Sequence, residues 1–424
     1  MMASELIRRF GSPAYVYDLT QVRAAHAALV ASLPKPSTIY YSLKANPHAR
    51  IVAELVRLGC AAEVSSVGEL RAALDVGAAP TACLYTGPGK TETELRQALL
   101  LGCYRYSVDS PWDLAKLGAA AADAKTRVEA LLRINPDSGV PGMGLTMCGA
   151  PSQFGADARW VLEEPGAFEP GAFVEIVGFQ FYMGSNLSNA ETVLRAAEVA
   201  LDTACSLVEH GFRCAVLDLG GGFGHPFAGP GERPDLSTLR RPLEQMLDRT
   251  FPAWRAKSPA VLFESGRYLV GSAGRLLATV QDVKRSKGRT FVVLDTGINH
   301  IGGMAGLRRV PKVGVVPEHR GDSPMYETDL VGPLCTPLDA LARGVSMPQL
   351  RPGDLVEIPN VGAYGLTASL VAFLSHAAPV EIVLGARGDN VADASRLVLH
   401  WAAFHREESH DTRAEIHAIG PATP

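Results

Sequence analysis

The feature that most constrains the fold of this 424-residue chain is a strand–helix alternation that repeats eight times between residues 38 and 267. Short β-branched or aromatic runs are each followed by an amphipathic helical pattern. The longest helical pattern covers residues 189–210 and is followed by Gly211, a residue type common at helix C-termini. This alternation predicts a (β/α)8 barrel, with an open doubly wound sheet as the alternative, because periodicity does not show whether a sheet closes. The expected strands are 38–44, 61–65, 82–87, 105–109, 128–135, 176–184, 215–221 and 260–267.

The pattern changes after about residue 270, where long helical segments become rare. Segments 271–283, 289–295, 354–358 and 379–384 have strand character and are separated by turns, which predicts a mainly antiparallel β domain. The β-prone run 13–17 precedes the barrel pattern and is a candidate strand of the same domain. We therefore expect an α/β barrel at residues 30–268 and a β domain built from residues 1–29 and 269–424.

The composition disfavours several classes of protein: those that bind nucleic acid, membranes or metals, and those held by disulfides. Hydrophobic residues make up 47% of the chain and the net charge is −4 without any basic block, which disfavours nucleic acid as a partner. No run of 18 apolar residues and no signal peptide is present, so we expect no membrane contact. The seven cysteines are scattered and lack C-x-x-C spacing, which favours a reducing cytoplasm and disfavours a metal site or a disulfide framework.

Lys44 ends the first expected strand, in the run Tyr40-Tyr41-Ser42-Leu43-Lys44. A lysine among buried strand residues is costly unless it has a chemical task. One such task is a Schiff base with pyridoxal phosphate (PLP), for which burial lowers the pKa of the amine and makes it nucleophilic. The alternative is a lysine at the mouth of a strand with its ammonium group in water.

Two further strand ends carry residue types suited to a cofactor. Three consecutive glycines at 220–222 leave backbone N–H groups that can approach an anion, and Gly266 on the next strand could join them. Glu264 ends the eighth strand, where a carboxylate can face the pyridine nitrogen of PLP. The alternatives are a glycine-rich turn without a ligand, and a structural salt bridge between Glu264 and Arg267.

Eight motifs in order resemble the fold-type III PLP-dependent decarboxylases, which include diaminopimelate, ornithine and biosynthetic arginine decarboxylases. They cover nearly the whole chain, and the resemblance implies an alanine-racemase-like (β/α)8 barrel with a C-terminal β domain. The motifs are Tyr41-Ser42-Leu43-Lys44-Ala45-Asn46, Glu63-Val64-Ser65-Ser66-Val67-Gly68-Glu69, Gln153-Phe154-Gly155, residues 178–185, Gly220-Gly221-Gly222-Phe223, Glu264-Ser265-Gly266-Arg267-Tyr268, Gly332-Pro333-Leu334-Cys335 and Gly362-Ala363-Tyr364.

The resemblance implies a role for each matching position. Lys44 would bind the PLP aldehyde, and Glu264 would pair with the pyridine nitrogen. Glu63 and Arg133 would support the environment of the ring. The residues implied at the phosphate or lining its pocket are Ser185, Gly221, Gly222, Gly266, Arg267 and Tyr364.

Cys335 is the second implied catalytic residue. In the family it would come from the other subunit of a homodimer and protonate the substrate carbon after loss of CO2. The β domain would then contribute to the dimer interface, and both active sites would be shared. The alternative for a lone cysteine is a small buried hydrophobic residue.

The chain departs from the family pattern at two positions. Tyr182 stands where a histidine usually stacks on the cofactor ring, and a tyrosine can stack there equally well. Thr336 stands where diamine-forming enzymes commonly carry an acid that binds the distal ammonium of the substrate. A neutral residue removes that charge partner, which makes diaminopimelate, ornithine and lysine less favoured as substrates.

Within the family, the chain most resembles the branch from butirosin biosynthesis that decarboxylates a glutamyl group on an acyl-carrier protein. This resemblance implies a role in specialised metabolism such as antibiotic biosynthesis. Arg308 and Arg309 are candidates for binding a substrate carboxylate, although adjacent loop arginines are more often solvated.

We therefore expect a cytoplasmic PLP-dependent amino-acid decarboxylase that acts on a free or carrier-bound amino acid. Three alternatives stay open: a diaminopimelate or other diamino-acid decarboxylase, an amino-acid racemase on the same fold, and a non-catalytic decarboxylase-like regulator.

Overall fold

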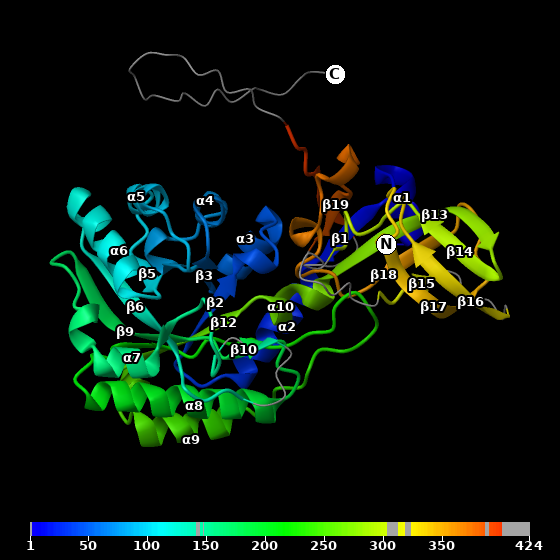
Figure 1. The fold of residues 1–424 in the computed structure, drawn as a ribbon. Helices are drawn as coiled ribbons and strands as arrows, with labels where there is room; N and C mark the ends of the chain where they lie inside the picture. The colour runs from blue at the N-terminus through cyan, green and yellow to red at the C-terminus, as the bar shows by residue number, and fades with distance from the viewer. Residues whose placement is uncertain are drawn as a thin grey trace, which may run out of the picture.

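The structure is a computed structural model that describes residues 2–140, 145–146, 148–302, 313–318, 324–385 and 390–400. Figure 1 shows a helix-covered barrel on one side of the molecule and a β domain on the other. Among the described residues, no helix is long and apolar enough to span a membrane.

The barrel is a closed ring of eight parallel strands, as predicted. Each strand pairs with its neighbours, and closure comes from the pairing of β2 with β12 and of β5 with β6. The alternative of an open sheet is therefore wrong. The strands are β2 (Thr38–Ser42), β3 (Ala61–Val64), β4 (Cys83–Tyr85), β5 (Arg105–Val108), β6 (Val128–Asn135), β9 (Val174–Phe181), β11 (Val216–Asp218) and β12 (Ala260–Ser265), with the short β8 (Ala156–Asp157) added beside β6.

Helices cover the outside of the barrel, and most begin at a polar N-cap shortly after a strand. Ser66, Ser110 and Asn189 each accept a backbone hydrogen bond at a helix start, and Thr91 forms a capping box with Glu94. These caps place each helix start at the strand ends where the site forms. The helices are α2 (Leu19–Ser32), α3 (Ala49–Arg57), α4 (Val67–Asp75), α5 (Glu92–Leu100), α6 (Pro111–Asp123), α7 (Ala158–Glu163), α8 (Ala190–Glu209), α9 (Arg240–Thr250) and α10 (Arg267–Val270).

The barrel interior changes from apolar to polar along the strands. One apolar cluster fills the layer nearer the amino ends of the strands. It consists of Tyr40, Leu84, Leu131, Val177, Val216 and Leu262. Because side chains alternate along a strand, the next inward positions lie two residues further on. For five of the six strands these positions are polar: Ser42, Thr86, Arg133, Asp218 and Glu264. The polar layer lies toward the carboxyl ends of the strands, where barrel active sites form.

The second domain is a mostly antiparallel sheet in the order β17-β16-β14-β13-β1-β19-β20, and β18 pairs with β13 and β15. The parallel pairs are β1 with β19 and β14 with β16. The strand β1 (Ala14–Asp18) confirms that the N-terminal run joins this sheet, and α1 (Ala3–Phe10) packs on it through Leu6. The other strands are β13 (Gly274–Ser286), β14 (Arg289–Leu294), β15 (Val316–Pro317), β16 (Met325–Val331), β17 (Ala340–Pro348), β18 (Leu355–Ile358), β19 (Val380–Leu384) and β20 (Val391–Arg396).

The domain boundaries at residues 30 and 268 remain a prediction. Helix α2 begins at Leu19 and lies against α3 and α10, so a segment before residue 30 contacts the barrel. The short strands β7 (Leu145–Thr146) and β10 (Gly184–Ser185) pair with each other beside the barrel mouth.

Gly178 allows β9 to approach β11 closely, at a register shift between β9 and β6. A Cβ at this position would collide with the carbonyl oxygen of Val216. We therefore expect Gly178→Ala to lower the free energy of unfolding by roughly 1–3 kcal/mol, measured by urea denaturation.

Gly118→Ala in α6 is the matched control, because its added Cβ meets nothing within 4 Å. Alanine should stabilise that helix by about 0.5–1 kcal/mol. Equal stability of Gly178→Ala and the wild type would contradict the described strand contact.

Candidate active site

A cavity of about 730 Å³ lies at the carboxyl ends of the barrel strands. Residues from both domains line it, and Tyr364 comes from the β domain. It brings together ten of the site residues predicted from the sequence: Lys44, Glu63, Arg133, Tyr182, Ser185, Gly222, Glu264, Gly266, Arg267 and Tyr364.

The Lys44 side chain projects from a single 3-10 turn (Leu43–Ala45) that follows β2. Its Nζ lies 3.0 and 3.1 Å from the two carboxylate oxygens of Glu63. Glu63 is buried on β3 and also accepts a 2.6 Å hydrogen bond from the Thr86 hydroxyl. The Lys44 side chain is 41% exposed, because the cavity reaches it. The amine is thus held by one carboxylate while staying accessible to a ligand.

The pKa of the Lys44 amine is shifted in the direction opposite to the one expected from the sequence. Burial acts to lower the pKa of its amine, but the charges of Glu63 and Glu264 outweigh this effect, and the pKa is raised. The prediction of a lowered pKa is therefore wrong for the protein without a ligand. Burial acts to raise the pKa of Glu63, yet Lys44 and the hydrogen bonds hold it below its ordinary value. The pair is an ammonium–carboxylate ion pair.

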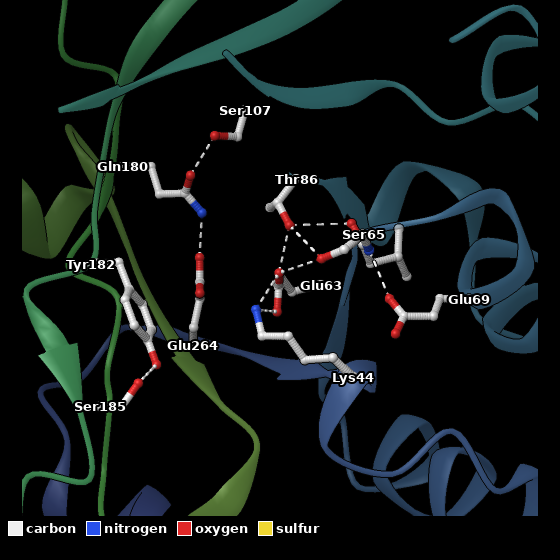
Figure 2. A network of polar contacts seen from close by, with 11 residues as sticks. Lys44, Glu63, Ser65, Glu69, Thr86, Ser107, Gln180, Tyr182, Ser185 and Glu264 are labelled. Carbon is white, nitrogen blue, oxygen red and sulfur yellow. Dashed lines mark hydrogen bonds and ion pairs between the residues drawn. The ribbon is translucent and has the colours of Figure 1, made fainter. Parts of the chain in front are cut away.

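Glu264 belongs to a chain of hydrogen bonds across the barrel interior. Gln180 on β9 donates its amide N–H to Oε1 of Glu264, and the Ser107 hydroxyl donates to the Gln180 carbonyl (Figure 2). Burial, and then the charge of Glu63, raise the pKa of Glu264, while Lys44 and Arg133 act in the opposite direction. The described ion pairs contain none between Glu264 and Arg267, so the salt-bridge alternative is wrong.

Arg267 and the glycines after two strands form a part of the site that is suited to an anion. A Cβ at Gly221, Gly222 or Gly266 would collide with a neighbouring backbone oxygen or with the Ala45 side chain. Gly222 also has a φ of +66°, which side chains rarely adopt. The Arg267 guanidinium lies 4.7 Å from the Tyr364 ring centre and has no carboxylate partner among the described residues. Burial lowers the pKa of Arg267, so a bound anion would relieve its desolvation.

Tyr182 and Arg133 form one wall of the cavity. The Arg133 guanidinium lies 4.8 Å from the Phe154 ring centre and 5.9 Å from that of Tyr182, between the two aromatic rings. The Tyr182 hydroxyl lies 3.1 Å from the hydroxyl of Ser185 (Figure 2). The Tyr182 ring therefore faces the cavity with its hydroxyl tied to the adjacent strand β10.

Tyr364 joins the β domain to the turn that carries Lys44. Its backbone N–H donates a 2.7 Å hydrogen bond to the carbonyl of Ala45, and its φ is +55°. A second bond, from the Asn46 side chain to the Gly362 carbonyl, measures 2.9 Å. Burial, and then Tyr182, raise the pKa of Tyr364 to about 12, so its hydroxyl is neutral. Such a strained tyrosine conformation persists only where surrounding contacts hold it.

Two of the predicted residues, Cys335 and Thr336, do not line the cavity in this single chain. Cys335 is exposed and Thr336 half-buried, both on the loop between β16 and β17, and neither lines the cavity. The alternative of a buried Cys335 is therefore wrong. Asp339 holds this loop by accepting 2.8 Å hydrogen bonds from the N–H groups of Ile298 and Leu334. Arg308 and Arg309 lie outside the described residues.

Several residues of the site were not predicted from the sequence. Gln180 and Ser107 connect to Glu264, Thr86 to Glu63, and Phe154 stacks on Arg133. The period-two alternation of a barrel strand would have indicated Gln180, which lies two positions before Tyr182. No local pattern marks Phe154 as a partner of Arg133.

Known proteins provide independent evidence. A sequence model described as the pyridoxal binding domain of pyridoxal-dependent decarboxylases matches residues 19–271. The chain is 31% identical over 389 residues to an L-glutamyl-acyl-carrier-protein decarboxylase from Niallia circulans, covering 89% of this chain and 90% of that protein. It is 30% identical to the diaminopimelate decarboxylase of Zymomonas mobilis, covering 86% of this chain and 85% of that protein.

Solved structures agree with these sequence matches. Diaminopimelate decarboxylase from Helicobacter pylori, complexed with L-lysine, aligns with a TM-score of 0.79 at 27% identity, over 92% of this chain and 94% of that one. Lysine decarboxylase from Selenomonas ruminantium aligns with a TM-score of 0.77 at 26% identity, over 90% and 94% of the two chains. The family match, the closed barrel and the cavity with its accessible lysine lead to one conclusion: the chain belongs to the pyridoxal-dependent decarboxylases.

Proposed function

We propose that this chain removes the α-carboxylate of an amino acid as CO2, with PLP bound through Lys44. The observation that carries the proposal is the arrangement of the cavity. An accessible amine and two buried carboxylates lie at one part of it, and at another lies Arg267, which is half-buried and has no carboxylate partner in the described part of the chain. This arrangement fits a coenzyme that has an aldehyde, a basic ring nitrogen and a phosphate.

Each part of the coenzyme has candidate partners. When bound, PLP supplies an aldehyde that condenses with an amine and a ring that takes up the electron pair of the broken bond. Glu264 would face the ring nitrogen, and Tyr182 would lie against the ring beside Arg133. The phosphate would be held by Arg267 and the uncovered backbone at Gly221, Gly222 and Gly266, with Ser185 and Tyr364 nearby.

Two protein groups would handle protons in the proposed reaction. Glu63 lies in direct contact with Nζ of Lys44, so it can hold the proton that the amine must lose before it acts as a nucleophile. Cys335 would return a proton to the α-carbon after CO2 leaves. Its exposure, and the anchoring of its loop by Asp339, support a role at the cavity of a partner subunit. The active enzyme would then be a homodimer with two shared sites.

The proposed substrate is an amino acid carried on an acyl-carrier protein, with a place in antibiotic biosynthesis. The Niallia circulans relative is named for a carrier-bound glutamyl substrate, and the neutral Thr336 provides no charge partner for a distal ammonium. A free diamino acid is the second candidate, because other relatives are named diaminopimelate decarboxylases. The seven free cysteines support a reducing compartment such as the cytoplasm.

A substrate panel with detection of released CO2 tests the reaction and the substrate together. We expect CO2 from carrier-bound glutamate and little from free glutamate or diaminopimelate. Lys44→Ala should reduce the release to background because it removes the amine, whereas Lys257→Ala, a surface control, should not. Racemisation without CO2 would contradict the decarboxylase. Release from diaminopimelate alone would contradict only the carrier-bound substrate.

Coenzyme binding tests the place of the phosphate. Arg267→Leu should weaken PLP binding by about 10- to 100-fold, because a charge-assisted hydrogen bond contributes about 1.5–3 kcal/mol. Binding of pyridoxal, which lacks the phosphate, should change little. Equal weakening for both ligands, measured by titration of the protein without coenzyme, would show that Arg267 has another role.

Mixed dimers test the shared site. Lys44→Ala and Cys335→Ala should each be inactive alone, since each lacks one catalytic group in both sites. Co-expressed in equal amounts, they should recover about a quarter of wild-type CO2 release, because half the dimers are mixed and each of these has one complete site. An inactive mixture would mean that both residues serve the same chain's site, whereas activity of Cys335→Ala alone would mean that Cys335 is dispensable.

A further inference from the structure

Asp218 is a buried carboxyl group to which the proposed chemistry assigns no role. It ends β11, directly before the turn at 219–222, and its side chain is fully buried. Oδ1 accepts a 2.9 Å hydrogen bond from the N–H of Gly220. Oδ2 is also buried, and among the described residues no donor reaches it. A charged carboxylate would leave this oxygen without compensation.

The strand register places Asp218 beside the carboxylate that would face the coenzyme. Asp218 pairs in register with Gln180 on β9, and Gln180 donates to Glu264 on β12. Asp218 also pairs in register with Leu262 on β12, two residues before Glu264, so its side chain and that of Glu264 come from neighbouring positions of adjacent strands. Three neighbouring strands thus bring an amide and two carboxyl groups together in the polar layer of the barrel.

The charges around this pair decide which carboxyl holds a proton. Two buried carboxylates on adjacent strands repel each other, which favours a proton on one of them. Glu264 has an amide donor from Gln180 and is influenced by the positive charges of Lys44 and Arg133. Asp218 is faced by Glu264 and by Glu63, with the Tyr40 phenol also near, and forms no ion pair in the described part of the chain. The electrostatic balance therefore favours ionised Glu264 and neutral Asp218.

We propose that Asp218 is a positioning residue that keeps a proton at neutral pH and donates it in a hydrogen bond to Glu264. The inference rests on the proposed role of Glu264 at the ring nitrogen. Glu264 then has a donor from Gln180 on one side and from Asp218 on the other. Both donors hold the carboxylate in one orientation and leave it ionised, as pairing with a protonated ring nitrogen requires.

The pH dependence of stability has a definite sign. Burial, and then Glu264, raise the pKa of Asp218 well above its ordinary value. The folded protein therefore holds a proton that the unfolded chain releases above about pH 4. Folding stability should fall as the pH rises from there through the raised pKa of the folded state, by the slope of one proton.

Asp218→Asn and Asp218→Ala separate this role from simple packing. Asparagine keeps a neutral side chain that can donate, so we expect PLP affinity within about 3-fold of wild type, whereas Ala should weaken it at least 10-fold, as one lost hydrogen bond to a charged group predicts. Asp202→Asn on the exposed face of α8 is the matched control and should leave PLP affinity unchanged.

Two measurements on the full chain without coenzyme test the proton itself. The infrared spectrum at neutral pH should contain a carboxylic-acid band that shifts in deuterium oxide and is missing in Asp218→Asn. Urea denaturation across pH should show the one-proton slope in the wild type and in Asp202→Asn, but not in Asp218→Asn. Neither readout requires catalysis, so a failure of the proposed reaction would leave them intact.

Either of two results would overturn the proposal. One is a wild-type spectrum without the carboxylic-acid band, which needs no variant and so does not depend on whether a variant folds. The other is an Asn variant that loses as much PLP affinity as the Ala variant, because a neutral donor would then be no substitute for Asp218.

Discussion

The pairing of β2 with β12 is the constraint on which the rest of the site depends. It closes the barrel and thereby places the turn that carries Lys44 beside the strand that carries Glu264. In an open sheet these two strands would lie at opposite edges, and their charged groups would face water. Closure instead places them in an interior with an apolar layer below and a cavity above. The chemistry of the chain follows from this closed polar layer.

The polar layer carries more negative than positive charge around the amine. Glu63, Glu264 and Asp218 face Lys44 and Arg133, and the only close ion pair among them in the described chain is that of Lys44 with Glu63. The excess can be relieved by a shared proton or by a ligand with a protonated nitrogen. Near Arg267 the balance is reversed, because none of the described carboxylates pairs with its guanidinium. A coenzyme with a basic nitrogen and an anionic phosphate would match both imbalances.

The sequence predicted the framework of this site better than its connections. Lys44, Glu264 and the glycines were found because each follows a strand pattern, and the carboxyl ends of parallel strands converge. The cross-strand bonds of Gln180 and Ser107 were missed, because register between strands is not encoded in any local motif. The pKa of Lys44 was predicted in the wrong direction, because burial was considered without the two carboxylates that closure brings near. The role of Cys335 stays a prediction, because it depends on a contact with a partner subunit.

The hydrogen bonds from Tyr364 to Ala45 and from Asn46 to Gly362 link the two domains on either side of the lysine. The turn that carries Lys44 is therefore held by both domains, because Ala45 and Asn46 form hydrogen bonds with the β domain. Any hinge motion between the domains would displace the amine relative to the carboxylates fixed on the strands. A barrel excised from this chain would keep Lys44 but lose the contacts that orient its turn, so the smallest unit that can hold the site includes both domains.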